Sequence, residues 1–201
     1  MWLAAHLLTR DMRIAVIGTG KIGGTLGGKW RAAGYDVVFG ARNPGDFGPG
    51  GAPVQTVHEA VDGADVVALA VPGKAVADIV ASLGSRLAGK VVIDAANRIG
   101  EPEVNSKSAV RAVAPGAHYV RAFNTLGWEN FADPLPSAAL FFAADPSARG
   151  VAEELIMAIG LEPAFVGEAD AAGIVDGALP LWFALVPLHG GNRRLALCVV
   201  R

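Results

Sequence analysis

A cluster of glycines near the N-terminus is the part of the chain whose spacing is best suited to chemistry. Six glycines fall within residues 18–28, and this segment begins Gly18-Thr19-Gly20-Lys21-Ile22-Gly23. The GxGxxG pattern directly follows the apolar run 13–17 and precedes a predicted helix. Gly18 permits a tight turn, Gly20 lets backbone N–H groups approach a pyrophosphate, and Gly23 lets the helix lie close to the strand. The N–H groups at the helix start favour an anion, so the segment predicts a dinucleotide site.

A glycine-rich turn that only allows close packing is the alternative. Glycine inside a helix costs roughly 0.5–1 kcal/mol relative to alanine. Gly24, Gly27 and Gly28 all fall within the predicted helix. Their cost is easier to understand if a ligand needs the space, and we therefore expect them to continue the small surface along the helix.

The end of the second predicted strand indicates which dinucleotide binds. In an NAD site a carboxylate there accepts hydrogen bonds from the ribose, whereas in an NADP site a basic residue meets the 2′-phosphate. The segment 37–43 has no carboxylate and ends in Ala41, Arg42 and Asn43. A guanidinium fork suits a phosphate in geometry and in charge, and Thr19 adds a hydroxyl from the neighbouring loop. A solvated surface arginine would not explain the missing acid, so the sequence favours NADP(H).

Strands alternate with helices along the rest of the chain. Apolar runs predict strands at 13–17, 36–39, 65–71, 90–94, 119–123, 138–143 and 163–166. Helices are predicted at 21–33 with Gly34 as its cap, and at 56–61, 73–87, 106–113, 146–159 and 169–188. Residues 43–53 are dense in glycine and proline and predict a loop. The alternation predicts an α/β fold with a doubly wound, mostly parallel sheet of the Rossmann type.

The composition restricts the classes of partner. Of the 201 residues 52% are hydrophobic, and the formal net charge is −2. The sequence has no basic run of the kind that predicts binding to nucleic acid or to a membrane surface. The apolar segment 179–188 is too short to span a bilayer, and we expect it to be a buried helix or a homodimer contact. Cys198 is the single cysteine, which excludes an internal disulfide and fits a reducing, cytoplasmic compartment.

The sequence predicts three parts. Residues 1–11 precede a second methionine, Met12, and lack the basic region and cleavage site of a signal peptide. We expect them to form an N-terminal extension outside the fold. Residues 12–168 are predicted to form the dinucleotide-binding domain. Residues 169–201 are predicted to form a short C-terminal helical segment, packed on that domain or on a second subunit.

Five segments, taken in order, resemble one family of reductases. They are Arg13–Gly23, Gly40–Pro44, Ala70–Pro72, Val92–Ala95 and Ala122–Gly127. Together they are similar to the NADPH-dependent reductases of the deazaflavin coenzyme F420, and the likeness extends from about Met12 to the C-terminus. The resemblance implies NADP(H) and coenzyme F420 as cofactors. It also implies direct hydride transfer between nicotinamide C4 and the deazaflavin.

The resemblance further implies where the cofactor binds. It places Thr19 and Arg42 at the 2′-phosphate, where Ala41 replaces a serine that the family often has. Three more segments lie at predicted strand ends, where ligands bind in open α/β sheets; they are Ala70-Val71-Pro72, Ala95 to Asn97, and Asn124-Thr125. Asn97 and Asn124 either bond the nicotinamide amide or satisfy loop backbone. Trp128 and Phe131 either wall an acceptor pocket or pack in the core.

No residue is predicted as a catalytic acid or base, or as a metal ligand. The sequence shows no Ser-Tyr-Lys arrangement, no HExxH motif and no obvious His–Asp pair. Asp94 stands at a strand end, but capping the next loop accounts for it as well as a catalytic role does. His189 is a candidate substrate contact. Hydride transfer between two cofactors depends on ring alignment more than on an acid or base, so the missing groups agree with that reaction.

Three functions follow from these residues. The first is hydride transfer from NADPH to coenzyme F420, a small-molecule redox acceptor. The second is reduction of another acceptor, such as a flavin, a ferric chelate or a small imine. Pyrroline-carboxylate reductases are disfavoured, because too few residues follow the sheet for their long helical dimerisation domain. The third is a non-enzymatic sensor that binds NADP and reports redox state to a partner.

Overall fold

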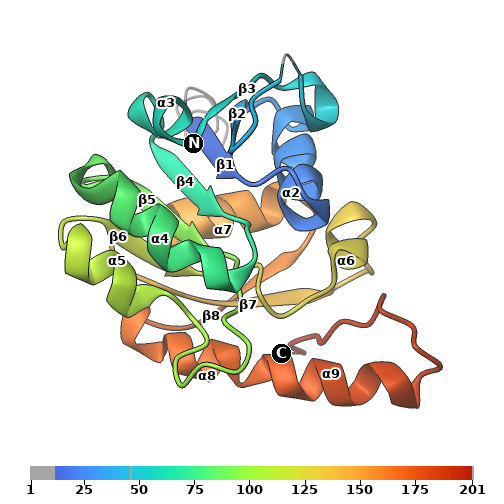
Figure 1. The fold of residues 1–201 in the computed structure, drawn as a ribbon. Helices are drawn as coiled ribbons and strands as arrows, with labels where there is room; N and C mark the ends of the chain where they lie inside the picture. The colour runs from blue at the N-terminus through green and yellow to red at the C-terminus, as the bar shows by residue number, and fades with distance from the viewer. Residues whose placement is uncertain (1–11, 46, 201) are drawn as a thin grey trace, which may run out of the picture.

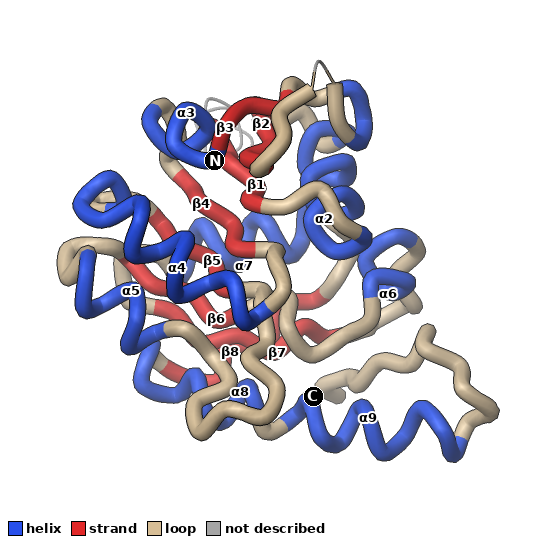
Figure 2. The backbone as a smooth tube through the Cα atoms, viewed as in Figure 1, coloured by secondary structure: helices blue, strands red, loops and turns tan. Residues whose placement is uncertain are grey.

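The computed structural model describes residues 12–45 and 47–200, and these fold around an eight-stranded sheet (Figures 1 and 2). The strands are β1 (Arg13–Ile17), β2 (Asp36–Ala41), β3 (Val54–Thr56), β4 (Val66–Leu69), β5 (Val91–Asp94), β6 (His118–Arg121), β7 (Ala139–Ala144) and β8 (Glu162–Gly167). They lie in the order β3-β2-β1-β4-β5-β6-β7-β8. All neighbours pair in parallel except β6 and β7, which are antiparallel. The predicted doubly wound, mostly parallel sheet is confirmed, while the predicted extension 1–11 lies outside the described residues.

Helices cover both faces of this sheet (Figure 2). They are α2 (Lys21–Ala32), α3 (Val57–Asp62), α4 (Gly73–Leu83), α5 (Lys107–Val113), α6 (Trp128–Ala132), α7 (Arg149–Ala158), α8 (Ala172–Asp176) and α9 (Ala178–Leu188). Three short 3-10 turns span Pro49–Gly51, Gly84–Leu87 and Ala169–Ala171. Side chains alternate along β1, so Ile14 and Val16 join the core under α2, α6 and α7. Ala15 and Ile17 join the core under α3, α4 and α5.

Two short elements were not predicted from the sequence. The expected loop 43–53 is followed by β3, whose three residues pair with β2. Trp128–Ala132 forms the single-turn helix α6. Elements this short carry little hydrophobic periodicity, and contacts with neighbouring segments decide their conformation. Gly34 follows α2 with a φ of +97°, as expected for a helix-ending glycine.

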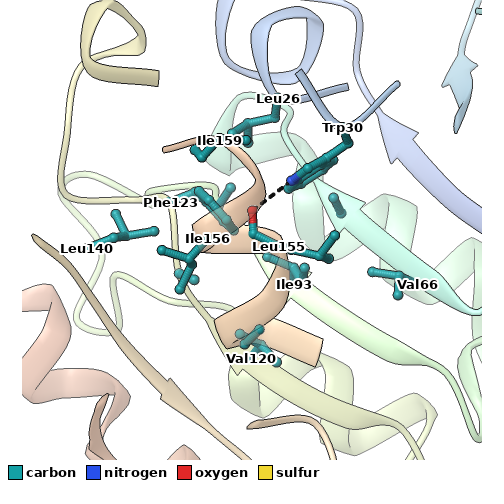
Figure 3. Packing of buried hydrophobic residues seen from close by; sticks show 14 of the residues in the cluster. Leu26, Trp30, Val66, Ile93, Val120, Phe123, Leu140, Leu155, Ile156 and Ile159 are labelled. Atoms are coloured by element: carbon teal, nitrogen blue, oxygen red, sulfur yellow. Dashed lines mark hydrogen bonds between the residues drawn. The ribbon is translucent and has the colours of Figure 1, made fainter. Parts of the chain in front are cut away.

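Trp30 joins α2 to α7 in the centre of one core (Figure 3). Its indole Nε1–H donates to the carbonyl oxygen of Leu155 at 3.0 Å, and the ring is fully buried. Leu155 lies in the last turn of α7, where carbonyls have no partner within the helix. Phe123 packs edge-on against Trp30, with ring centroids 5.5 Å apart. The bond therefore satisfies a helix end while the rings fill the core.

The C-terminal segment contains a buried part and an exposed part. Residues Ala169–Leu188 form a helical stretch of 20 residues that is long and apolar enough to cross a membrane, by length and composition alone. It is longer than the segment 179–188 considered from the sequence. Trp182 is buried, but Phe183 and Leu188 are 50% and 79% exposed. The chain then runs back beside α9, where Leu195 accepts a bond from Trp182 (Figure 1). The homodimer expected from this segment stays a prediction.

Replacing Trp30 with phenylalanine tests the link between α2 and α7. The Trp30→Phe variant keeps an aromatic ring but leaves the buried Leu155 carbonyl without its donor. We expect the free energy of unfolding to fall by about 1–3 kcal/mol, measured by urea denaturation. Trp182→Phe is the control, because its bond to the C-terminal tail is only part-buried. Equal losses in the two variants would contradict this assignment.

Candidate functional site

The glycine loop places the start of α2 directly against the ends of β1 and β4. Gly18 has a φ of +111°, and a Cβ there would lie 2.5 Å from the carbonyl oxygen of Ala70. A Cβ on Gly23 would collide with the carbonyl oxygen of Gly18. Gly20 is the N-cap of α2, and no side chain caps this helix start. The first N–H groups of α2 are thus left for a ligand, and a Cβ on Gly20 would meet nothing within 4 Å.

A cavity of about 310 Å³ opens beside this helix start. Three segments line it: Gly20-Lys21-Ile22, Ala70-Val71-Pro72-Gly73 and Ala95-Ala96-Asn97. They follow β1, β4 and β5, so the cavity lies at the carboxyl ends of adjacent parallel strands, where open α/β sheets bind ligands. Eight predicted site residues come together here, namely Gly20, Lys21, Ile22, Ala70, Val71, Pro72, Ala95 and Asn97.

Seven predicted site residues do not line this cavity: Gly18, Thr19, Gly23, Ala41, Arg42, Asn43 and Asn124. Gly18 and Gly23 instead form the close contact beneath it. Of the other two lining residues, Ala96 lies within the predicted segment Ala95–Asn97, whereas Gly73 was not predicted to line the site. A Cβ on Gly73 would collide with the carbonyl oxygen of Asn97, so this glycine lets two walls of the cavity approach each other.

Two of the later glycines of α2, Gly24 and Gly27, serve packing rather than the cavity. A Cβ on Gly24 would lie 2.9 Å from a ring carbon of Pro49, and one on Gly27 would lie 2.5 Å from the ring of Phe39. None of Gly24, Gly27 and Gly28 lines the cavity. The expectation that these three glycines extend the ligand surface is therefore wrong for Gly24 and Gly27, whose missing side chains let α2 lie against its neighbours.

Arg42 lies at the tip of β2, next to the glycine loop. Gly18 donates its N–H to the carbonyl oxygen of Gly40 at 3.0 Å, which fixes the two strand ends side by side. Thr19, Arg42 and Asn43 follow these strand ends and are exposed. Arg42 makes no hydrogen bond or ion pair with residues 12–45 or 47–200. Its guanidinium is thus available to a phosphate at the adenosine end of a dinucleotide.

Asn97 and Asn124 are bound to the protein and to each other. The Asn97 Nδ2 donates to the carbonyl oxygen of Asn124 at 2.8 Å, and its Oδ1 accepts from Arg121 at 2.7 Å. The Asn124 Nδ2 donates to Asp176 at 3.2 Å, while its buried Oδ1 has no partner among the described residues. The other N–H of the Asn97 amide takes no part in these bonds, and Asn97 lines the cavity. Both asparagines therefore support the loops in which they lie.

Asp94 holds the loop that follows β5. Its carboxylate accepts from the backbone N–H groups of Ala96 and Ser106, and from the hydroxyl of Tyr119 at 2.8 Å. Burial raises the pKa of Asp94, and the nearby Arg121 guanidinium opposes that rise. Burial and then the Asp94 charge raise the pKa of Tyr119 well above its usual value. Asp94 therefore caps the loop behind the cavity and does not line it.

The other residues considered from the sequence lie outside the cavity wall. Phe131 is fully buried and packs edge-on against Phe123, with ring centroids 5.8 Å apart, so it belongs to the core. Trp128 lies under the Lys21 ammonium, 5.4 Å from the ring centroid, at the rim of the site. His189 is exposed beyond the end of α9. Among the described residues, no group of three His, Cys, Asp or Glu side chains could hold a metal ion.

The site fits a dinucleotide on these observations. The helix start supplies uncapped N–H groups and a partial positive charge for the pyrophosphate. The open space at Gly20 leaves room for it. The cavity between the three strand ends then has uncharged walls for the nicotinamide end, apart from Lys21.

Comparisons with known proteins agree with this geometry. A metalloreductase from Rattus norvegicus, STEAP3, is 27% identical over 180 residues; these are 84% of this chain but 36% of that protein. The chain thus spans about a third of its length. A protein from Arthrobacter sp. FB24, provisionally assigned as an F420-dependent NADP reductase, superposes with a TM-score of 0.83 and 22% identity. That match covers 95% of this chain and all of the other.

A further structure of the same fold contains NADPH. It is a reductive aminase from Aspergillus terreus, with a TM-score of 0.71 and 18% identity over 90% of this chain and 63% of the aminase. Residues 13–98 match the family model described as NADP oxidoreductase, coenzyme F420-dependent. This match contains the glycine loop, Arg42 and all three segments that line the cavity. The part of the chain that contains the candidate site therefore resembles the NADP oxidoreductases of this family, as the sequence motifs predict.

Proposed function

We propose that this chain transfers a hydride from NADPH to the deazaflavin coenzyme F420. The carrying observation is the cavity at the ends of β1, β4 and β5, which joins a pyrophosphate cradle to a nearly uncharged chamber. Bound NADPH supplies the hydride and becomes NADP+, and the deazaflavin takes up that hydride together with a proton from water. Lys21 is the one ionisable residue among the ten that line the cavity.

The protein's part in such a reaction is to hold two rings. The chamber walls are small or apolar at Ala70, Val71, Pro72 and Ala95, which suits the face of a nicotinamide ring. Direct hydride transfer needs donor and acceptor carbons at near-attack distance rather than a general acid or base. The absence of histidine and carboxylate side chains from these ten lining residues is consistent with that requirement.

The family description supports F420 as the acceptor, and other acceptors remain the second candidate. The metalloreductase relative supports a metal chelate, and the reductive aminase supports an imine. The chain spans only part of both proteins, so their acceptors are weaker guides than the family model.

An acceptor panel tests this proposal. Purified protein and NADPH are mixed with coenzyme F420, a free flavin, a ferric chelate or a cyclic imine, and the nicotinamide absorbance is followed. We expect rapid turnover with F420 and none with the other three acceptors. Turnover with only the imine or the chelate would overturn the F420 proposal. Tight NADPH binding without turnover on any acceptor would favour the sensor function.

Replacing Arg42 tests cofactor selection. Arg42→Ala removes the cation at the tip of β2, so NADPH loses a charge-assisted contact that NADH never makes. We expect the Kd of NADPH to rise about 10–100-fold, and that of NADH to stay within about twofold, by calorimetry. The control is Arg86→Ala, which removes an exposed arginine paired with Asp62 away from the cavity. An equal change for both nucleotides would contradict the selectivity argument.

Replacing Gly20 separates ligand contact from folding. Gly20→Ala adds a methyl that meets no protein atom within 4 Å, so the melting temperature should be unchanged. The methyl would occupy the pyrophosphate position, and we expect the Kd of NADPH to rise at least about tenfold. Gly28→Ala is the matched control, because it also meets nothing within 4 Å but lies outside the cavity. Unchanged affinity in Gly20→Ala would place the dinucleotide elsewhere.

A further inference from the structure

Arg121 is a charged side chain in the interior of the fold, and its guanidinium donates four hydrogen bonds. It lies at the end of β6 and is 0% exposed. Nε donates to Asp176 Oδ1 at 2.7 Å, and Nη2 forms an ion pair with the same oxygen at 2.6 Å. Nη1 donates to the carbonyl oxygens of Asp94 and Ala96, at 3.0 and 2.5 Å. Nη2 donates to Asn97 Oδ1 at 2.7 Å. The guanidinium therefore ties α8 to the loop after β5.

Asp176 is the carboxylate that fixes this guanidinium. Asp94 also lies near Arg121, but at 3.4 Å, and its oxygens already accept from Ser106, Ala96 and Tyr119. Asp176 instead faces two donors of Arg121. An isolated buried charge is strongly destabilising, so the guanidinium must stay where this carboxylate is. The position of α8 therefore sets the position of the Arg121 fork.

The network reaches solvent at the cavity wall. Asp94, Ala96, Arg121 and Asp176 are all buried, whereas Asn97 is half-buried and lines the cavity. Both ends of the Asn97 amide are held, one by Arg121 directly and the other through the Asn124 backbone. Asn124 itself donates to Asp176. Asp176 therefore supports the Asn97 amide along two routes.

We propose that Asp176 is a positioning residue for hydride transfer, acting through Arg121 on Asn97 and the Ala95–Asn97 wall. This inference rests on the proposed function, in which that wall bounds the nicotinamide end of the cavity. The phosphate-binding elements belong to β1, α2 and the tip of β2, and none of them contacts Asp176 in the bonds described above. Loss of Asp176 should therefore disturb the ring while leaving the grip on the phosphates.

Asp176→Asn tests this assignment at nearly constant volume. The amide removes the charge and turns a donor toward Arg121 or Asn105, so the fork and the Asn97 amide lose their fixed geometry. We expect the Kd of NADPH to stay within about threefold, while single-turnover hydride transfer slows at least about tenfold. The fluorescence lifetime of bound NADPH, which depends on how rigidly the ring is held, should also change. The control is Asp170→Asn, which removes an exposed ion pair with Lys107 from the turn before α8.

A second variant keeps the test decisive if Asp176→Asn does not fold. Asn105→Ala removes the 2.8 Å hydrogen bond from Asn105 Nδ2 to Asp176 Oδ2 and leaves both buried charges in place. It should show the same pattern, a slower hydride step at unchanged Kd, with a smaller amplitude. A wild-type rate and lifetime in a folded Asp176→Asn or Asn105→Ala variant would overturn the inference. So would a rise in Kd that matches the fall in rate.

The double variant tests the route. If Asp176 acts through Asn97, adding Asp176→Asn to Asn97→Ala should slow hydride transfer no further than Asn97→Ala alone. Multiplied losses would overturn the route. The lifetime measurement needs no acceptor, so it tests positioning even if F420 is not reduced. A wild-type protein that does not bind NADPH would instead overturn the proposed function, and this inference with it.

Discussion

The close approach of α2 to the strand ends is the constraint on which the cavity depends. Gly18 turns the chain at a φ of +111° with its missing Cβ against Ala70, and Gly23 rests on the Gly18 carbonyl. Packed interiors hold little spare volume, so a side chain at either position would force the helix away from the sheet. The N–H groups at the start of α2 would then no longer face the segment Ala70–Gly73. Backbone proximity, rather than any side chain, therefore creates the anion cradle.

Five of the six glycines of this region divide into groups with different physical roles. Gly18 and Gly23 allow backbone contact, and Gly20 leaves open space for a ligand. Gly24 and Gly27 let α2 rest on Pro49 and Phe39, which lie in the chain that follows β2 and in β2 itself. Packing and binding are linked here, because α2 must lie close to the sheet both to pack against Pro49 and Phe39 and to present its first N–H groups to a ligand. The glycine content of α2 is therefore not a measure of how large the ligand is.

The sequence predicts the sheet and most of the cavity, because both depend on local patterns. The strand-turn-helix at Gly18–Gly23 and the small residues after two buried strands are visible without tertiary structure. The network around Arg121 is not visible in this way, because Arg121 and its partner Asp176 are 55 positions apart in the sequence. One signal was present: Arg121 interrupts an apolar strand, where a charge needs a buried partner. Sequence alone cannot say which carboxylate supplies that partner, and β3 and α6 are too short to predict.

The two ends of the cavity are held by different parts of the fold. The phosphate end depends on β1, α2 and β2, whose contribution is backbone N–H groups, a helix dipole and the exposed Arg42 cation. The inner end depends on β5, β6 and α8, whose contribution is a buried charge network with no exposed charge at the wall. An exposed cation such as Arg42 attracts a phosphate from solution, whereas the buried Arg121 guanidinium with its four hydrogen bonds fixes the geometry of the wall. Under the proposed function, affinity and ring orientation would thus depend on separate strands, and α8 would belong with the second group although it lies far from the glycine loop in sequence.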